Sequence, residues 1–146
     1  MHRKTLLRVS LAAFVVSLLC ASAPLAANAV TSWGLTSAPP TILGYSHTAR
    51  SGVNHTTSNL IGMTEITSSP AAPAGWMGVN CRIFQSSNDA LKVDTGYAFT
   101  TSAYGSYTKF CYFGSHGTYY SWGVTALYNG SGNTYTYTYR SPDRTW

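Results

Sequence analysis

An alternation of apolar and polar side chains with a period of two residues constrains the fold of this chain more than any other feature. It is clearest in Met77–Gln85, where Val79, Cys81 and Ile83 fall on one face and polar residues stand between them. No window shows the i, i+3, i+4, i+7 apolar spacing of an amphipathic helix. The sequence therefore predicts an all-β chain that is essentially free of helix.

Residues 1–29 have the pattern of a secretory signal peptide. Basic residues precede the apolar stretch Leu11–Leu19, and Ala27-Asn28-Ala29 supplies the small residues of a cleavage site. The apolar stretch is too short for a convincing membrane span. We expect cleavage after Ala29, no stable membrane insertion after cleavage, and secretion of residues 30–146 as a single extracellular β domain.

The charge of the mature chain argues against nucleic acid as a partner. The full chain has nine Lys and Arg and four Asp and Glu. Three of the basic residues lie in the leader, which leaves six against four, a formal net charge of +2. These six are scattered along the sequence, whereas phosphate backbones are bound by clustered positive charge.

Two cysteines remain after cleavage, Cys81 and Cys111, and we expect them to form one disulfide. Closing a loop of about 30 residues contributes roughly 3–4 kcal/mol in the chain-entropy model. The expected fold is a small antiparallel β-sandwich, immunoglobulin-like in general architecture, in which the bridge links the two sheets and Trp76 or Trp122 packs on it. No tryptophan lies between the cysteines, as one does in antibody domains, so the prediction concerns the architecture and not the family.

Turn-forming residues set the boundaries of the other predicted strands. Ser68–Gly75, with its two prolines, is expected to be a loop, and Asp94-Thr95-Gly96 a turn between two strands. Besides Met77–Gln85, the predicted strands are Thr31–Leu35, Ile42–Ser46, Asn59–Thr67, Ala90–Val93, Tyr97–Thr101, Lys109–Phe113, Thr118–Tyr128 and Thr134–Arg140.

The last predicted strand reads TYTYTYR, and an NGSGN turn joins it to the strand before it. Any hairpin loop of even length places Val124 and Ala126 on the same face as Tyr135 and Tyr137, with the threonines on the other face. We predict that the tyrosines form a half-buried wall and that the strand is paired on both sides. The alternative is a free edge that accepts a strand from a partner protein.

Residue types that carry catalysis or bind metals are scarce, so no catalytic residue, metal site or cofactor is predicted. Four carboxylates are present, no GxSxG motif occurs, and pairing removes both cysteines as nucleophiles. The histidine spacing matches no metal signature, and the histidines are expected in loops or at the surface. The carboxylates are Glu65, Asp89, Asp94 and Asp143, and the histidines are His47, His55 and His116.

Aromatic residues are abundant: the chain has 11 tyrosines and 4 tryptophans. Such side chains give a large contact area with few rotatable bonds, which favours a binding surface. We therefore expect a secreted, non-catalytic binding or adapter module that contacts an extracellular protein or a cell-wall carbohydrate. A small secreted antibacterial factor or protease inhibitor is the alternative, and a small hydrolase is the third possibility. The candidate binding residues are Trp33, Tyr104, Tyr107, Tyr119, Tyr120 and Trp146.

The segment from Tyr119 to Trp146 contains an aromatic strand, a YNG turn, a tyrosine strand and then SP. In this order of features it resembles the C-terminal segments of small secreted proteins of Gram-positive bacteria. The resemblance implies secretion and β structure, and no activity.

Overall fold

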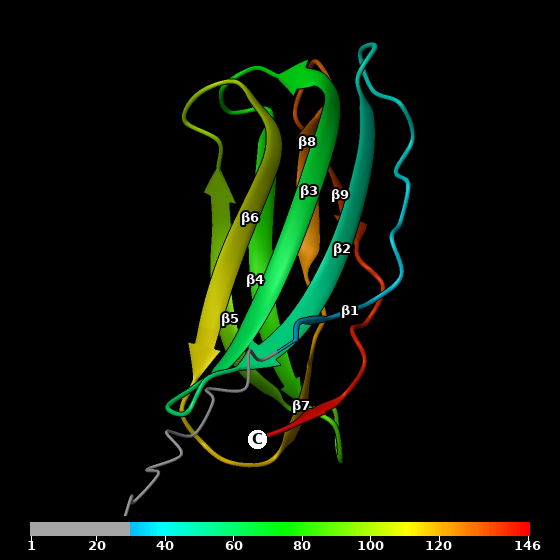
Figure 1. Ribbon diagram of the computed structural model, residues 1–146. Coiled ribbons are helices and arrows are strands. Elements are labelled where there is room, and N and C mark those ends of the chain that lie inside the picture. The colour runs from blue at the N-terminus through cyan, green and yellow to red at the C-terminus, as the bar shows by residue number, and fades with distance from the viewer. Residues whose placement is uncertain (1–29) are drawn as a thin grey trace, which may run out of the picture.

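The computed structural model describes residues 30–146, which form two antiparallel β-sheets and contain no helix. The predicted signal peptide lies outside the described residues. The four-stranded sheet has the order β1 (Ser32–Trp33), β2 (Ser46–His55), β3 (Leu60–Ala72) and β6 (Tyr104–Phe113). The six-stranded sheet contains β4 (Met77–Gln85), β5 (Leu91–Phe99), β7 (Thr118–Ser121), β8 (Val124–Tyr128), β9 (Asn133–Tyr137) and β10 (Arg144–Thr145). Figure 1 shows the sheets as two layers, with β6, β3 and β2 in front of β5, β4 and β8.

Strand β4 is the centre of the six-stranded sheet. One of its edges pairs with β5. Its other edge pairs with β8 over Met77–Asn80 and with β7 over Ile83–Gln85. Strands β7 and β8 thus follow one another along the same edge, separated by Trp122 and Gly123. The sequence analysis predicted a single strand over Thr118–Tyr128, and this break corrects it.

The disulfide between Cys81 of β4 and Cys111 of β6 joins the two sheets, as predicted, with the two Cα atoms 5.8 Å apart. Both cysteines belong to an apolar cluster with Val53, Leu60, Ile83 and Tyr119. Trp146 packs against this cluster, so neither Trp76 nor Trp122 has the position expected beside the bridge. A second apolar cluster contains Ile66, Ala72, Met77, Val79 and Leu127.

A buried layer of hydroxyl groups lies between the two apolar clusters. Ser51, Thr64 and Thr138 are almost completely buried. The Ser51 and Thr138 hydroxyl oxygens are 2.7 Å apart, and the Gly123 N–H donates to both, at 2.9 and 3.1 Å. Such groups are stable in a protein interior only when hydrogen-bonded, so this network holds β2 and β3 of one sheet against the β7–β8 break of the other.

Strand β5 is one continuous strand where two were predicted with a turn between them. Gly96 has a positive φ of 64°, and the pairing of β4 with β5 shifts register beside it. The Asp94 carboxylate accepts the Gly96 N–H at 2.8 Å, and the Thr95 hydroxyl accepts the Cys81 N–H at 3.1 Å. The turn-forming residues therefore produce a bulge that stays within the strand.

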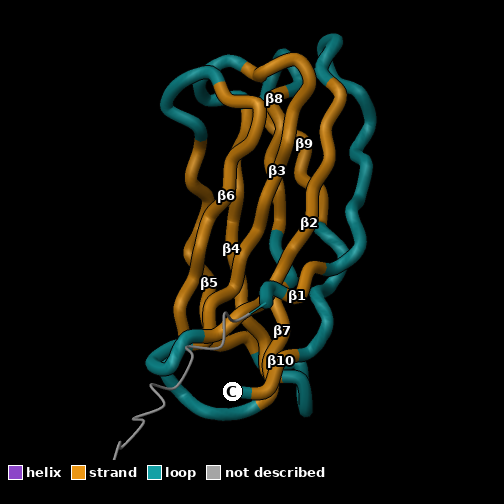
Figure 2. Tube along the Cα trace, viewed as in Figure 1, coloured by secondary structure: helices purple, strands orange, loops and turns teal. Residues whose placement is uncertain are grey.

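The N-terminal half also differs from the prediction. Strand β2 covers Ser46–His55, where no strand was predicted beyond Ser46, and residues 34–45 form a loop beside it (Figure 2). Ser37 in this loop forms an isolated bridge with Ala49. Strand β3 continues through Pro70 to Ala72, into the segment predicted as a loop, and its pairing with β6 is irregular between Thr67 and Ala72. A proline is tolerated there because no regular ladder bond is required of it.

The final hairpin has a loop of even length, as predicted, but the prediction of which face is buried is wrong. Its loop is Asn129–Gly132, and Val124 pairs with Tyr137. Tyr135, Tyr137 and Tyr139 are 53–56% exposed, whereas the alternating Thr138 is buried. The threonine face points into the protein, where the Thr138 hydroxyl joins the internal network described above.

Strand β9 is an edge strand, and the prediction that it is paired on both sides is wrong: within residues 30–146 it pairs with β8 alone. The Thr138 N–H donates to the Gly123 carbonyl at 3.1 Å. In an antiparallel pair the ladder donors of one strand recur at every second residue. The Thr136 N–H therefore faces β8, and the N–H groups of Tyr135 and Tyr137 face the free edge.

Candidate binding face

The six residues proposed from the sequence do not form one surface. Trp33 lies on the outer side of the four-stranded sheet, under the Arg50 guanidinium at 4.1 Å. Tyr104 and Tyr107 stack on each other on β6, with their ring centroids 6.2 Å apart. Trp146 lies against His116 at 4.4 Å. The expected exposure of the Tyr119–Tyr120 pair is wrong, because both residues are buried.

Aromatic side chains gather instead on the outer side of the six-stranded sheet. Cys81 and Ile83 of β4 point inward, so Arg82 and Phe84 point outward, and strand pairing brings outward residues of β5, β7, β8 and β9 beside them. We call this surface the aromatic face. Its rings belong to Phe84, Tyr97, Phe99, Tyr120, Trp122, Tyr135 and Tyr137.

The rings of the aromatic face touch in two runs. In the first, Phe84 stacks on Tyr120 with centroids 5.4 Å apart and lies 5.9 Å from Trp122, which lies 5.2 Å from Tyr137. In the second, Tyr97 lies 6.2 Å from Phe99 and 5.2 Å from Tyr135. Aromatic pairs at these distances gain energy beyond that of the buried area, so each ring helps to hold its neighbours in place.

Small residues lie beneath the second run of rings. Tyr97 is on β5 and Tyr135 is on β9, so their contact passes over β4 and β8, which lie between them. Val124 and Ala126 are buried although they are on the outer side of β8. A Cβ atom on Gly78 would lie 2.6 Å from the Phe99 ring. The absence of a side chain at Gly78 thus lets the Phe99 ring lie directly on the strand.

Arg82 is the cation of the aromatic face. Its guanidinium carbon lies 5.2 Å from the centroid of the Tyr137 ring, 5.4 Å from that of Phe84 and 5.8 Å from that of Trp122. Its Nε donates to the Trp122 carbonyl at 3.1 Å, and its Nη2 is buried with no hydrogen-bond partner among the described residues. These rings hold the cation through their electron-rich faces.

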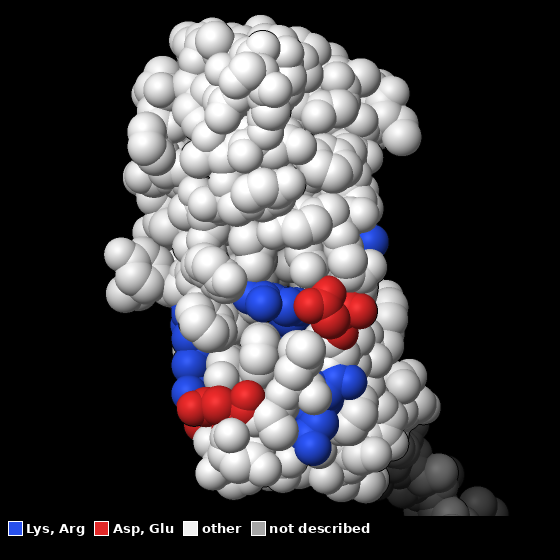
Figure 3. Space-filling model, turned by 180° about the vertical axis from the view of Figure 1, so that it is seen from behind, with Lys and Arg blue, Asp and Glu red and all other residues white. Residues whose placement is uncertain are grey.

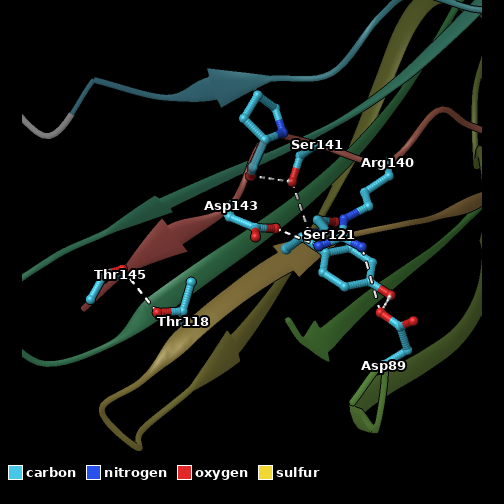
Figure 4. A network of polar contacts seen from close by, with 9 residues as sticks. Asp89, Thr118, Ser121, Arg140, Ser141, Asp143 and Thr145 are labelled. Atoms are coloured by element: carbon cyan, nitrogen blue, oxygen red, sulfur yellow. Dashed lines mark hydrogen bonds and ion pairs between the residues drawn. The ribbon is translucent and has the colours of Figure 1, made fainter. Parts of the chain in front are cut away.

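A second cation, Arg140, closes one end of the aromatic face, but carboxylates neutralise it. Its guanidinium lies 3.5 Å from the centroid of the Tyr120 ring and pairs with Asp143 at 2.6 Å and Asp89 at 3.5 Å (Figure 4). The hydrogen bond to Asp143 raises the pKa of Arg140. Burial raises the pKa of Tyr120, whose hydroxyl donates to Asp89 at 2.8 Å. This end is a closed network of paired charges.

Charge is distributed unevenly over the side of the molecule that carries the aromatic face. Figure 3 shows Lys, Arg, Asp and Glu in the middle and lower parts of that side and none in its upper part. The upper part of this side therefore offers no formal charge to a ligand. Sequence alternation carried a signal for this surface, because Tyr97 and Phe99 flank Ala98 and Phe84 follows Arg82 by two residues.

The carboxylates of the described chain hold its structure. Glu65 pairs with Arg50 and accepts the Ser106 hydroxyl, and Asp94 supports the β5 bulge. No group of three or more His, Cys, Asp or Glu side chains within residues 30–146 is arranged to hold a metal ion. His47 lies inside the protein on β2, which corrects its expected place in a loop or at the surface.

The same range, residues 30–146, contains no helix long and apolar enough to cross a membrane. The chain matches no protein-family model, no curated protein and no solved structure with which it was compared. The aromatic face is therefore the observation on which a functional proposal depends.

Proposed function

We propose that this chain is a secreted, non-catalytic binding module on an immunoglobulin-like β-sandwich, and that its aromatic face binds the glycan chains of a cell wall. The observation that carries the proposal is the set of seven rings and Arg82 on one side of one sheet. The disulfide between Cys81 and Cys111 is compatible with an extracellular location.

The composition of the face suits a sugar as its ligand. A sugar ring has apolar C–H faces and a rim of hydroxyls, and the tyrosines offer a ring and a hydroxyl on each side chain. Tyr97, Tyr135 and Tyr137 are 40–56% exposed, so both parts are within reach of a ligand.

The face is also preorganised for binding. Each ring touches at least one other ring, and Arg82 touches three of them, so few rotors remain to be ordered by a ligand. Preorganisation lowers the entropic cost of association. The rings also lie on one side of one sheet, which suits an extended polymer more than a small compact molecule.

Co-sedimentation with insoluble polymers tests the proposal. The mature protein is mixed with peptidoglycan sacculi, chitin or cellulose, and bound protein is measured against polymer concentration. Tyr137→Ala removes a ring that contacts Trp122 and Arg82 and should weaken binding at least about tenfold, or 1.4 kcal/mol. The matched control is Tyr112→Ala, which removes a tyrosine of similar exposure, 59% against 56%, from the outer side of the four-stranded sheet.

The proposal requires that Tyr112→Ala bind as the unsubstituted protein does. Equal loss of binding in both variants would place the site elsewhere. Failure of the folded protein to sediment with any of the three polymers would reject glycan binding, and capture of a protein by the same face would then favour an adapter role.

A further inference from the structure

We infer that the aromatic face selects glycans that carry a carboxylate, and that Arg82 is the group that recognises it. The inference rests on the proposed function, because it names the class of glycan bound at the same site. Arg82 is a half-buried cation that forms no ion pair with a carboxylate of residues 30–146.

Two other arginines of the described chain form ion pairs with carboxylates of the same chain. Arg50 pairs with Glu65, and Arg140 pairs with Asp89 and Asp143. Arg82 and Arg144, in contrast, have no carboxylate within ion-pair distance among residues 30–146, and of these two Arg82 is the one that contacts rings of the aromatic face. Asp94 is opposite Arg82 on β5, but its carboxylate accepts the Gly96 N–H at 2.8 Å.

The surroundings of Arg82 make an anionic partner favourable. Three rings replace part of its hydration shell, and its Nη2 is buried with no hydrogen-bond partner among residues 30–146. A hydrogen bond to a charged acceptor is stronger than one to a neutral group. A carboxylate at the exposed part of this half-buried guanidinium would therefore supply the anionic partner that residues 30–146 do not supply.

The partner that best fits is a carboxylate on a sugar. A carboxylate is planar, as the guanidinium is, and the two groups form two parallel hydrogen bonds. The face carries Arg82 and Arg140 against Asp89, Asp94 and Asp143, so it has no excess of positive charge for a dense polyanion. Sparse single charges along an otherwise uncharged polymer suit it better.

Binding to polygalacturonate and to its methyl ester tests the inference, because the two polymers differ only in whether the carboxylates are free. The unsubstituted protein should bind the free acid at least about tenfold more tightly than the ester. This preference should shrink as salt is raised from about 0.05 to 0.5 M, because salt screens an exposed ion pair. A poly(glycerol phosphate) arm distinguishes carboxylate from phosphate recognition.

Two variants test whether Arg82 causes the preference for the free acid over the ester. Arg82→Gln should bind both forms of the polymer equally, and Arg82→Lys should keep part of the preference, because it keeps the charge and loses the planar fork. Arg50→Gln, on the outer side of the other sheet, is the control and should keep the full preference. Melting temperatures of all variants show that each is folded before its binding is interpreted.

The outcomes separate the inference from the proposed function. Equal binding of the free acid and the ester, equal binding of the phosphate polymer, or unchanged preference in Arg82→Gln overturns carboxylate recognition and leaves glycan binding standing. Binding of chitin or cellulose without binding of polygalacturonate also overturns it. Binding of none of these polymers, nor of peptidoglycan sacculi, rejects the proposed function itself.

Discussion

Gly123→Ala should destabilise this protein more than most substitutions of one glycine by alanine. Gly123 lies at the break between β7 and β8, where its N–H donates to the Ser51 and Thr138 hydroxyls. A Cβ atom at this position would lie 2.0 Å from Oγ1 and 2.3 Å from Cγ2 of Thr64, inside their van der Waals radii. Thr64 is fully buried, so it has no solvent into which to move.

The expected cost has two parts. Overpacking of a filled core costs about 1–3 kcal/mol. Displacing the backbone of Gly123 also weakens two buried hydrogen bonds, and a buried group left unsatisfied costs about 1–3 kcal/mol. We therefore expect a loss of about 2–6 kcal/mol, a large share of the typical 5–15 kcal/mol of a domain. At about 4 °C per kcal/mol, the melting temperature should fall by about 8–24 °C.

Thermal unfolding followed by circular dichroism measures this loss, and two further variants make the result specific. Gly132→Ala is the control, because a Cβ atom there meets nothing within 4 Å, and its melting temperature should be nearly unchanged. Thr64→Ala removes the two atoms nearest to the new Cβ, so the double variant Gly123→Ala/Thr64→Ala should be more stable than the sum of the single losses. A Gly123→Ala protein as stable as Gly132→Ala would refute the close packing of the two sheets at this point.

Three other predictions concern the bridge, the interior histidine and the edge strand. Replacing Cys81 and Cys111 by alanine should cost about 2–5 kcal/mol, measured by denaturant unfolding, and two free thiols in the native protein would contradict the bridge. Burial lowers the pKa of His47, so the unfolded chain binds its proton more readily. The stability that depends on neutral His47 is then fully present above a pH of about 6.5 and is lost as the pH falls through the lowered pKa. His47→Phe should flatten this part of the plot of melting temperature against pH. An unchanged plot would show that His47 does not cause the loss of stability. Thr136→Pro removes an N–H that donates to β8 and should unfold or strongly destabilise the hairpin. Tyr135→Pro removes an N–H that faces the free edge, so this variant should have a higher melting temperature than Thr136→Pro. The reverse order of melting temperatures would show that the Thr136 N–H does not face β8.

Local sequence patterns predicted the parts of the fold that depend on residues close together in the sequence. The Met77–Gln85 strand has the predicted bounds, because its alternation is regular and turn residues flank it. The disulfide and its link between the sheets were also predicted, since residues 30–146 contain two cysteines. The bulge at Gly96 was predicted as a turn, because the same residue types serve both structures and only the partner strand decides between them.

The orientation of the last strand depended on contacts that are distant in the sequence. Alternation separates Thr136 and Thr138 from the tyrosines, but it does not say which set is inside. Hydrophobicity favoured the tyrosines, whereas the Thr138 hydroxyl bonds to that of Ser51, which is 87 residues away. The tyrosines in turn pack on rings from β5 and on Trp122. Neither set of partners is visible from the local pattern, so the sequence did not predict that these tyrosines share one face with rings of other strands.

The central claim, that the aromatic face binds glycan, is tested most directly by mapping the contact in solution. Amide and indole resonances of the isotopically labelled protein are followed by NMR during titration with soluble peptidoglycan fragments. The claim predicts shifts concentrated at Tyr97, Tyr137 and the indole N–H of Trp122, which donates to the Thr138 carbonyl at 2.8 Å. Phe110 and Tyr112, on the outer side of the four-stranded sheet, should not shift. Shifts confined to those two residues and their neighbours, or no shifts at saturating fragment, would contradict the claim.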